Sequence, residues 1–118
     1  MERVYSGERG SNGCVVKVDG RLLQPRLDLH TYTFQGFDWG GDGAGETQLA
    51  MAILADYYGR WGLEHCALSL AEDFRDLVVC WLAYASWSLA EQEVAAAVRE
   101  ILRERGARAG SAPVGVLM

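Results

Sequence analysis

The sequence predicts an α+β fold in which a small antiparallel sheet packs on three helices. Three observations support this prediction. An Asp19-Gly20 pair separates two apolar runs near the N-terminus, which is a strong signal of a β-hairpin. The stretch 47–58 is apolar on almost every side, as expected of a buried helix. Apolar residues then recur at helical spacing in two later segments, 70–85 and 88–105.

The N-terminal third of the chain is expected to form the sheet. The β-branched run 14–18 and the shorter run 21–23 are the two arms of the hairpin, because Asp-Gly tolerates the positive φ angles of a type I′ turn. Residues 4–6 add a short third strand. The segment 27–34 alternates apolar and polar residues imperfectly and is also predicted to be extended. The sheet therefore consists of the N-terminal hairpin plus one or two strands.

The remainder is expected to form three helices. The first spans about 47–58 and ends at Gly59. The second and third each begin with the letters Ser-Leu-Ala-Glu, at 69–72 and 88–91, which match a capping box. The short interval between the two boxes favours antiparallel neighbouring helices. Gly106 is predicted to end the third helix.

Length and composition predict one domain, residues 1–106, followed by a flexible tail, 107–118. No apolar run approaches the roughly 18 residues of a membrane span, and the N-terminus lacks the order of a signal peptide. A cytoplasmic protein without membrane contact is therefore expected. The three cysteines form no CxxC pair, so neither a metal nor another cofactor is predicted.

The acidic charge is concentrated in the middle of the chain. The net charge is −5, and residues 31–98 hold ten acidic and two basic side chains, a balance of −8. This distribution argues against direct nucleic-acid binding, which needs clustered lysine and arginine. It favours a protein partner with a basic surface, although a solvated helix face is the simpler explanation. The sequence leaves the oligomeric state open.

The Gly40–Thr47 loop matches the P-loop spacing GxxxxGK[ST] except at one position, where Glu46 replaces the lysine. A glutamate there repels phosphate, so the first interpretation is a tight corner leading into the buried helix, with Glu46 stabilising the helix dipole. The second interpretation is a contact surface for a ligand or partner. Its candidate interaction residues are the polar and aromatic ones of the corner, expected to be exposed: Asp38, Trp39, Asp42, Glu46 and Gln48.

The segment 37–54 also carries a recognisable motif. It matches the pattern WGYGGSGPAQLA at Trp39, Gly40, Gly43, Gly45, Gln48, Leu49 and Ala50. In this motif the chain resembles an uncharacterised family of small phage-, plasmid- and prokaryote-encoded proteins, over residues 4 to about 102. Its departures from the pattern include Gly41, Asp42, Ala44 and Glu46. The resemblance implies a mobile genetic element and no known catalytic residue. By analogy, small acidic proteins of such elements often bind and block host proteins.

Two functional hypotheses follow from these observations. The first is a non-enzymatic protein-binding module of a mobile genetic element, an inhibitor of a host or defence protein in the manner of an anti-CRISPR protein. It is favoured by the acidic middle of the chain and by the lack of GxSxG, HExxH or a similar catalytic motif. The alternative is a small-ligand-binding or enzymatic domain that uses the Gly40–Thr47 loop.

Overall fold

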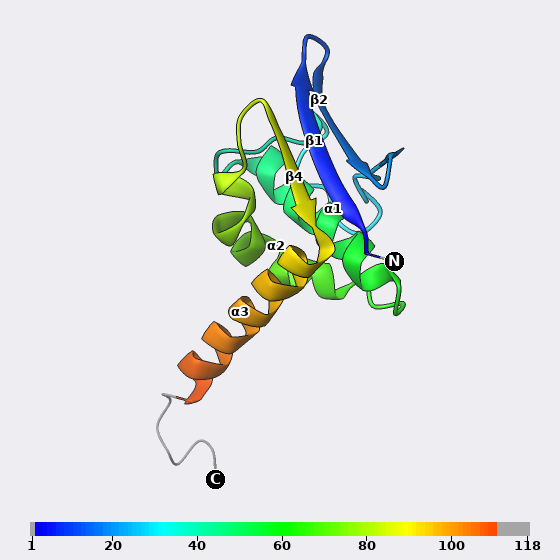
Figure 1. The fold of residues 1–118 in the computed structure, drawn as a ribbon. Helices are drawn as coiled ribbons and strands as arrows, with labels where there is room; N and C mark the ends of the chain where they lie inside the picture. Colours follow the sequence, from blue (N-terminus) through cyan, green and yellow to red (C-terminus); the bar gives the residue numbers. More distant parts are fainter. Residues whose placement is uncertain (1, 111–118) are drawn as a thin grey trace.

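The computed structural model describes residues 2–110, and within that range it confirms the α+β fold. A four-stranded antiparallel sheet lies against helices, and the last helix extends away from the body of the domain (Figure 1). No helix in the described range is long and apolar enough to cross a membrane. The elements in chain order are β1 (Val4–Gly10), β2 (Gly13–Val18), β3 (Arg21–Leu22), α1 (Ala44–Gly59), α2 (Cys66–Leu77), the 3-10 turn η1 (Val79–Trp81), β4 (Ser86–Ala90) and α3 (Glu91–Gly110).

Strand β1 is central, and the strand order is β3-β2-β1-β4. Its residue Tyr5 is paired with Val18 on β2 and with Leu89 on β4. The predicted hairpin between β2 and β3 is confirmed, because Asp19 and Gly20 have φ angles of 50° and 84°, as a type I′ turn requires. The short third strand predicted at residues 4–6 is also present, and it is longer than expected.

Strand β4 occupies the place where the third helix was predicted to begin. Trp87 and Leu89 are buried while Ser86 and Ser88 are exposed, which is the two-residue period of a strand. The predicted capping box at 88–91 is therefore wrong, since its serine lies in the sheet. The helix begins at Glu91 instead. The strand also separates α2 from α3, so the expected short link between the two helices is wrong as well.

The other helix boundaries also shift. Ser69 is not a cap but lies inside α2, where its hydroxyl donates a hydrogen bond to the carbonyl of Cys66 at 3.3 Å. The helix ends at Leu77, and the apolar positions predicted to continue it fall in η1 and the following loop. Helix α3 does not end at Gly106 but continues to Gly110. Of the predicted tail, residues 107–110 are helical and 111–118 lie outside the described residues.

The segment 27–34 is not a strand, contrary to the prediction. It contains a turn in which the carbonyl of Arg26 accepts hydrogen bonds from the amides of Leu29 and His30. Downstream, the amides of Tyr32 and Thr33 donate to the side chain of Gln48 rather than to a neighbouring strand. The imperfect alternation of this segment reflects a loop that covers α1.

Helix α1 is the centre of the core. Ten consecutive residues, from Glu46 to Ala55, are buried. The inner face of the sheet contributes Tyr5, Val16 and Val18 to the same cluster, and α2 and α3 contribute apolar side chains at Leu70, Phe74, Val94 and Val98. Figure 1 shows α1 behind the sheet, with α2 beside it. The prediction of a buried first helix is thus confirmed, although α1 begins at Ala44 rather than at about residue 47.

Replacing Gly7 by alanine is expected to destabilise the sheet. A Cβ on Gly7 would lie 2.5 Å from Cε2 of the Trp87 indole, which covers this glycine from the neighbouring strand. A cost of about 1–3 kcal/mol in the free energy of unfolding follows from such overpacking. Gly10→Ala on the same strand is the matched control, because its Cβ would meet nothing closer than 3.9 Å. Urea unfolding of both variants checks this, and an equal loss would contradict it.

Candidate functional site

The glycine-rich run turns the chain into α1. Gly40 has a φ of 89°, a conformation that favours glycine. A Cβ on Gly45 would lie 2.9 Å from Cβ of Asp38, and the carbonyl of Gly45 accepts a hydrogen bond from the Asp38 amide at 3.3 Å. Gly43 is the N-terminal cap of the helix. These positions support the first interpretation of the run, a tight corner leading into the buried helix.

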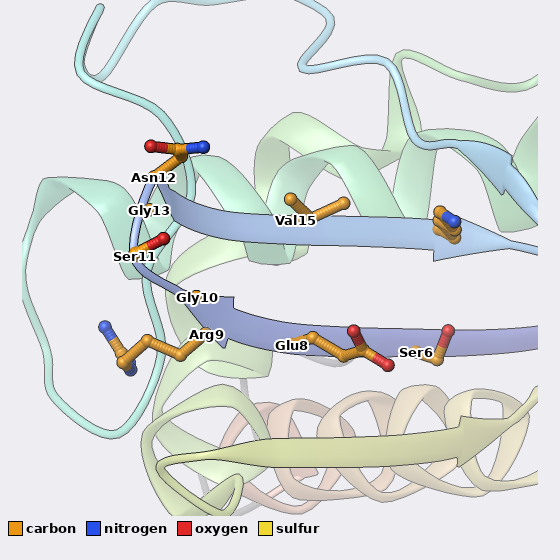
Figure 2. A pocket seen from close by; sticks show the side chains of 9 residues that line it. Ser6, Glu8, Arg9, Gly10, Ser11, Asn12, Gly13 and Val15 are labelled. Carbon is orange, nitrogen blue, oxygen red and sulfur yellow. The ribbon is translucent and has the colours of Figure 1, made fainter.

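Arg9 joins three distant segments at this corner. Its Nη2 donates to Oδ1 of Asp38 at 3.0 Å, and its Nε donates to the carbonyl of Tyr84 at 3.0 Å. Its guanidinium also lies 4.8 Å from the Trp39 ring centre and 4.0 Å from that of Tyr84. Figure 2 shows the Arg9 side chain near the end of β1, beside the turn that joins β1 to β2. Arg9 was not a predicted site residue, and no local pattern marks a contact across so many residues.

Three of the predicted interaction residues, Trp39, Glu46 and Gln48, are buried rather than exposed, and Trp39 and Gln48 are hydrogen-bonded within the fold. Trp39 is 2% exposed, its Nε1 donates to the Tyr84 carbonyl at 2.9 Å, and its ring meets Trp87 edge to face. Gln48 is 1% exposed. Its amide donates to the carbonyls of Pro25 and His30, in addition to accepting the two loop amides described above. Both side chains therefore support the fold.

Asp38, Asp42 and Glu46 remain as interaction candidates. Asp42 is exposed, and the side chain of Asp38 is about half-exposed although it is paired with Arg9. Glu46 is only 7% exposed, and its carboxylate has no hydrogen-bond or ion-pair partner among residues 2–110. Its Oε2 lies 2.7 Å from the place where a Cβ on Gly41 would stand. A negative charge thus occupies the space in front of the loop, where a phosphate would have to lie.

A hollow of about 500 Å³, which we call the corner notch, opens between this loop and the segment 80–84. The amide of Gly40 donates to the carbonyl of Val79 at 3.1 Å, which holds the two segments together. Six of the side chains that line the notch are Asp38, Trp39, Glu46, Cys80, Trp81 and Tyr84. Trp81 and Tyr84 are 79% and 70% exposed. Neither residue is among the predicted site residues; Trp81 falls in the segment 70–85, where apolar residues at helical spacing predict a buried stripe.

The cysteine in the notch is a poor nucleophile. Burial raises the pKa of the Cys80 thiol, the nearby Asp76 carboxylate raises it further, and its Sγ donates to the Asp76 carbonyl at 2.9 Å. Its thiolate is therefore disfavoured at neutral pH. In the described part of the chain, no group of three or more His, Cys, Asp or Glu is placed to hold a metal ion.

A second hollow, of about 400 Å³, lies beside the hairpin formed by β1 and β2 (Figure 2). Figure 2 shows Ser6 and Glu8 along β1 and Val15 on β2, all on the same side of the strands. Glu8, Val15 and Lys17 are exposed. This surface combines scattered polar groups with one apolar side chain, and its charged residues Glu8 and Lys17 are exposed to solvent. We therefore take the corner notch as the candidate site.

The chain was compared with protein families, with curated proteins and with solved structures. Residues 5–100 match a family described as "Family of unknown function (DUF6166)". A comparison with curated proteins found no match. A comparison with solved structures also found none.

Trp39 and Trp81 line the same notch, but truncating them is expected to change the free energy of unfolding by very different amounts. Trp39→Ala removes a core indole and should lower the free energy of unfolding by about 3–5 kcal/mol. Trp81→Ala removes an exposed ring and should change it by no more than about 0.5 kcal/mol. Chemical denaturation of the two variants measures both effects. Equal stability of the two variants would show that the burial of Trp39 contributes little to folding.

Proposed function

The chain belongs to this family of unknown function (DUF6166), and we propose that it is a non-enzymatic protein-binding module that uses the corner notch and its rim. The observation that carries the proposal is the pair of exposed aromatic rings, Trp81 and Tyr84, at the edge of a hollow. Large aromatic side chains that are left in solvent beside a hollow are typical of protein-binding sites. Burial and the Asp76 carboxylate raise the pKa of the Cys80 thiol in the notch, which disfavours this cysteine as a nucleophile.

The rigid support of this surface favours binding with little rearrangement. The main chain at Tyr84 is held by Arg9 and by the indole of Trp39, each donating to the Tyr84 carbonyl. Trp81 is the last residue of the 3-10 turn η1, which is tied to the corner by the hydrogen bond from the Gly40 amide to the Val79 carbonyl. Pre-organised contact residues lose less conformational entropy on association.

The biological setting belongs to the same proposal. The motif at 37–54 resembles a family of phage-, plasmid- and prokaryote-encoded proteins, which supports a mobile genetic element as the source. We extend the proposal to inhibition of a host or defence protein in the cytoplasm, in the manner of an anti-CRISPR protein. The balance of −8 over residues 31–98 supports a partner with a basic surface and disfavours direct contact with nucleic acid.

The alternative of a phosphate-ligand site in the Gly40–Thr47 loop is not favoured by the geometry. The carboxylate of Glu46 lies against Gly41 and Gly43, at the helix terminus where a phosphate would bind. Like charges in this space repel. The protein-binding surface is therefore the only function that we propose.

Affinity capture from host lysates tests the proposal. Tagged full-length protein is expected to retain a specific partner, and Trp81→Ala is expected to reduce its recovery by about tenfold or more, since central aromatic residues carry much of the binding energy. Trp61→Ala is the matched control, because Trp61 is 54% exposed and lies just beyond the opposite end of α1. Recovery of no partner from several lysates, or equal loss in both variants, would count against the proposal.

Thermal denaturation in the presence of nucleotides and sugar phosphates tests the alternative. The wild-type protein is expected to show no stabilisation, because Glu46 repels the phosphate. Glu46→Gln, which removes this charge and keeps the shape of the side chain, serves as the comparison. A ligand-dependent rise in Tm of the wild type that is abolished in Gly45→Val would instead support a phosphate site in the loop.

A further inference from the structure

We propose that the corner notch receives an arginine side chain of the protein partner, whose guanidinium pairs with the carboxylate of Glu46. This inference rests on the proposed function and specifies the chemistry of the partner at the same site. It is carried by the contrast between Glu46 and its two neighbours at the start of α1. The three consecutive polar residues are all buried, and only one of them is without a partner.

The two neighbours are fully engaged within the fold. The hydroxyl of Thr47 donates to the Gly43 carbonyl at 3.0 Å and accepts a hydrogen bond from Arg75 at 2.9 Å. The amide of Gln48 makes four hydrogen bonds to the covering loop. The carboxylate of Glu46 has none within residues 2–110, yet more than nine-tenths of the residue is buried. Within the described residues the one buried side-chain nitrogen or oxygen without a partner is Nε1 of Trp87, so the carboxylate oxygens of Glu46 reach solvent through the notch and can accept hydrogen bonds from a group that enters from outside.

The charge balance around the notch favours a cation. Arg9 is already committed to Asp38, and Arg75 donates to both Asp76 and Thr47. Within each of the two pairs, Arg9 with Asp38 and Arg75 with Asp76, the charges cancel. The negative charge of Glu46 has no such counterpart in the described part of the chain. Asp42 adds a further carboxylate close by, since its charge contributes to raising the pKa of the Cys80 thiol in the notch wall. A positive group entering the notch therefore gains both Coulomb attraction and a hydrogen-bond acceptor.

The aromatic rim favours guanidinium over ammonium. A guanidinium is planar, stacks on aromatic rings and donates two parallel hydrogen bonds to a carboxylate, whereas an ammonium is a compact and strongly hydrated charge. The fold itself uses this arrangement, because Arg9 lies over the rings of Trp39 and Tyr84 while it donates to Asp38. The volume of about 500 Å³ suits a single long side chain with part of its backbone.

Titration of the isotope-labelled full chain with short capped peptides tests the inference. The probes are Gly-Arg-Gly, the same peptide with neutral citrulline, and Gly-Lys-Gly, each followed through the backbone amides of 40–46 and the indole of Trp81. We expect saturable shifts with the arginine peptide and binding about tenfold weaker or worse with citrulline and lysine. Absence of shifts with the arginine peptide, or equal affinity for citrulline or lysine, would overturn the inference.

Variants give an independent measurement. Glu46→Gln should weaken the arginine peptide about tenfold and leave citrulline binding unchanged, while Glu8→Gln, on the outer face of the sheet, should change neither. An arginine affinity that survives Glu46→Gln would contradict the pairing. Should this variant fail to fold, the comparison of arginine with citrulline on the wild-type chain still decides the question.

The peptide titration and the lysate capture separate the two proposals. A partner that is captured equally by the wild type and by Glu46→Gln, together with no preference for arginine over citrulline, would uphold protein binding and reject the arginine pocket. A Glu46-dependent preference for the arginine peptide without any captured partner would uphold the pocket and reject the wider function.

Discussion

Helix α1 is enclosed by protein along ten consecutive residues, from Glu46 to Ala55, and this enclosure determines what the other elements must supply. A helix that is apolar all round has no face left for solvent, so it needs cover on every side. The inner face of the sheet, α2, the start of α3 and the loop before α1 together provide that cover. A long connection without regular structure lies between β3 and α1, and one function of it is to cover the helix.

The polar start of α1 shows how the same constraint shapes the site. A buried polar group is tolerated when its hydrogen bonds are made, and the loop and Arg75 satisfy Gln48 and Thr47 in this way. Glu46 makes no such bond within the described residues, and its carboxylate oxygens reach solvent through the notch beside Trp81 and Tyr84. The unpaired charge and the exposed rings thus occur where the cover of the helix is interrupted. The carboxylate of Glu46 lies in the first turn of α1, where the helix dipole stabilises a negative charge.

The elements that the sequence predicted well are those with a local cause. The Asp19-Gly20 turn and the apolar stretch of α1 are recognisable within a few residues. The Ser-Leu-Ala-Glu pattern wrongly predicted two helix N-termini. The four residues from Ser69 lie inside α2, and three of the four from Ser88 belong to β4, where pairing with β1 decides the conformation. The site was only partly predictable for a related reason. Glu46 was marked by its departure from the P-loop spacing, whereas Arg9 reaches the corner through contacts between residues far apart in sequence.

The pairing of β1 also has a consequence for the order of folding. One edge of this strand finds β2 directly after the first turn, but the other edge waits for β4, so Tyr5 meets Leu89 only when nearly the whole domain has been synthesised. Contacts of such separation close a large loop and slow the search for the native state. While residue 90 is still inside the ribosome, β4 cannot pair with β1. One edge of β1 is then unpaired, and the apolar surface of α1 beneath the sheet is incompletely covered. The growing protein is therefore open to wrong strand partners until its last strand, β4, emerges.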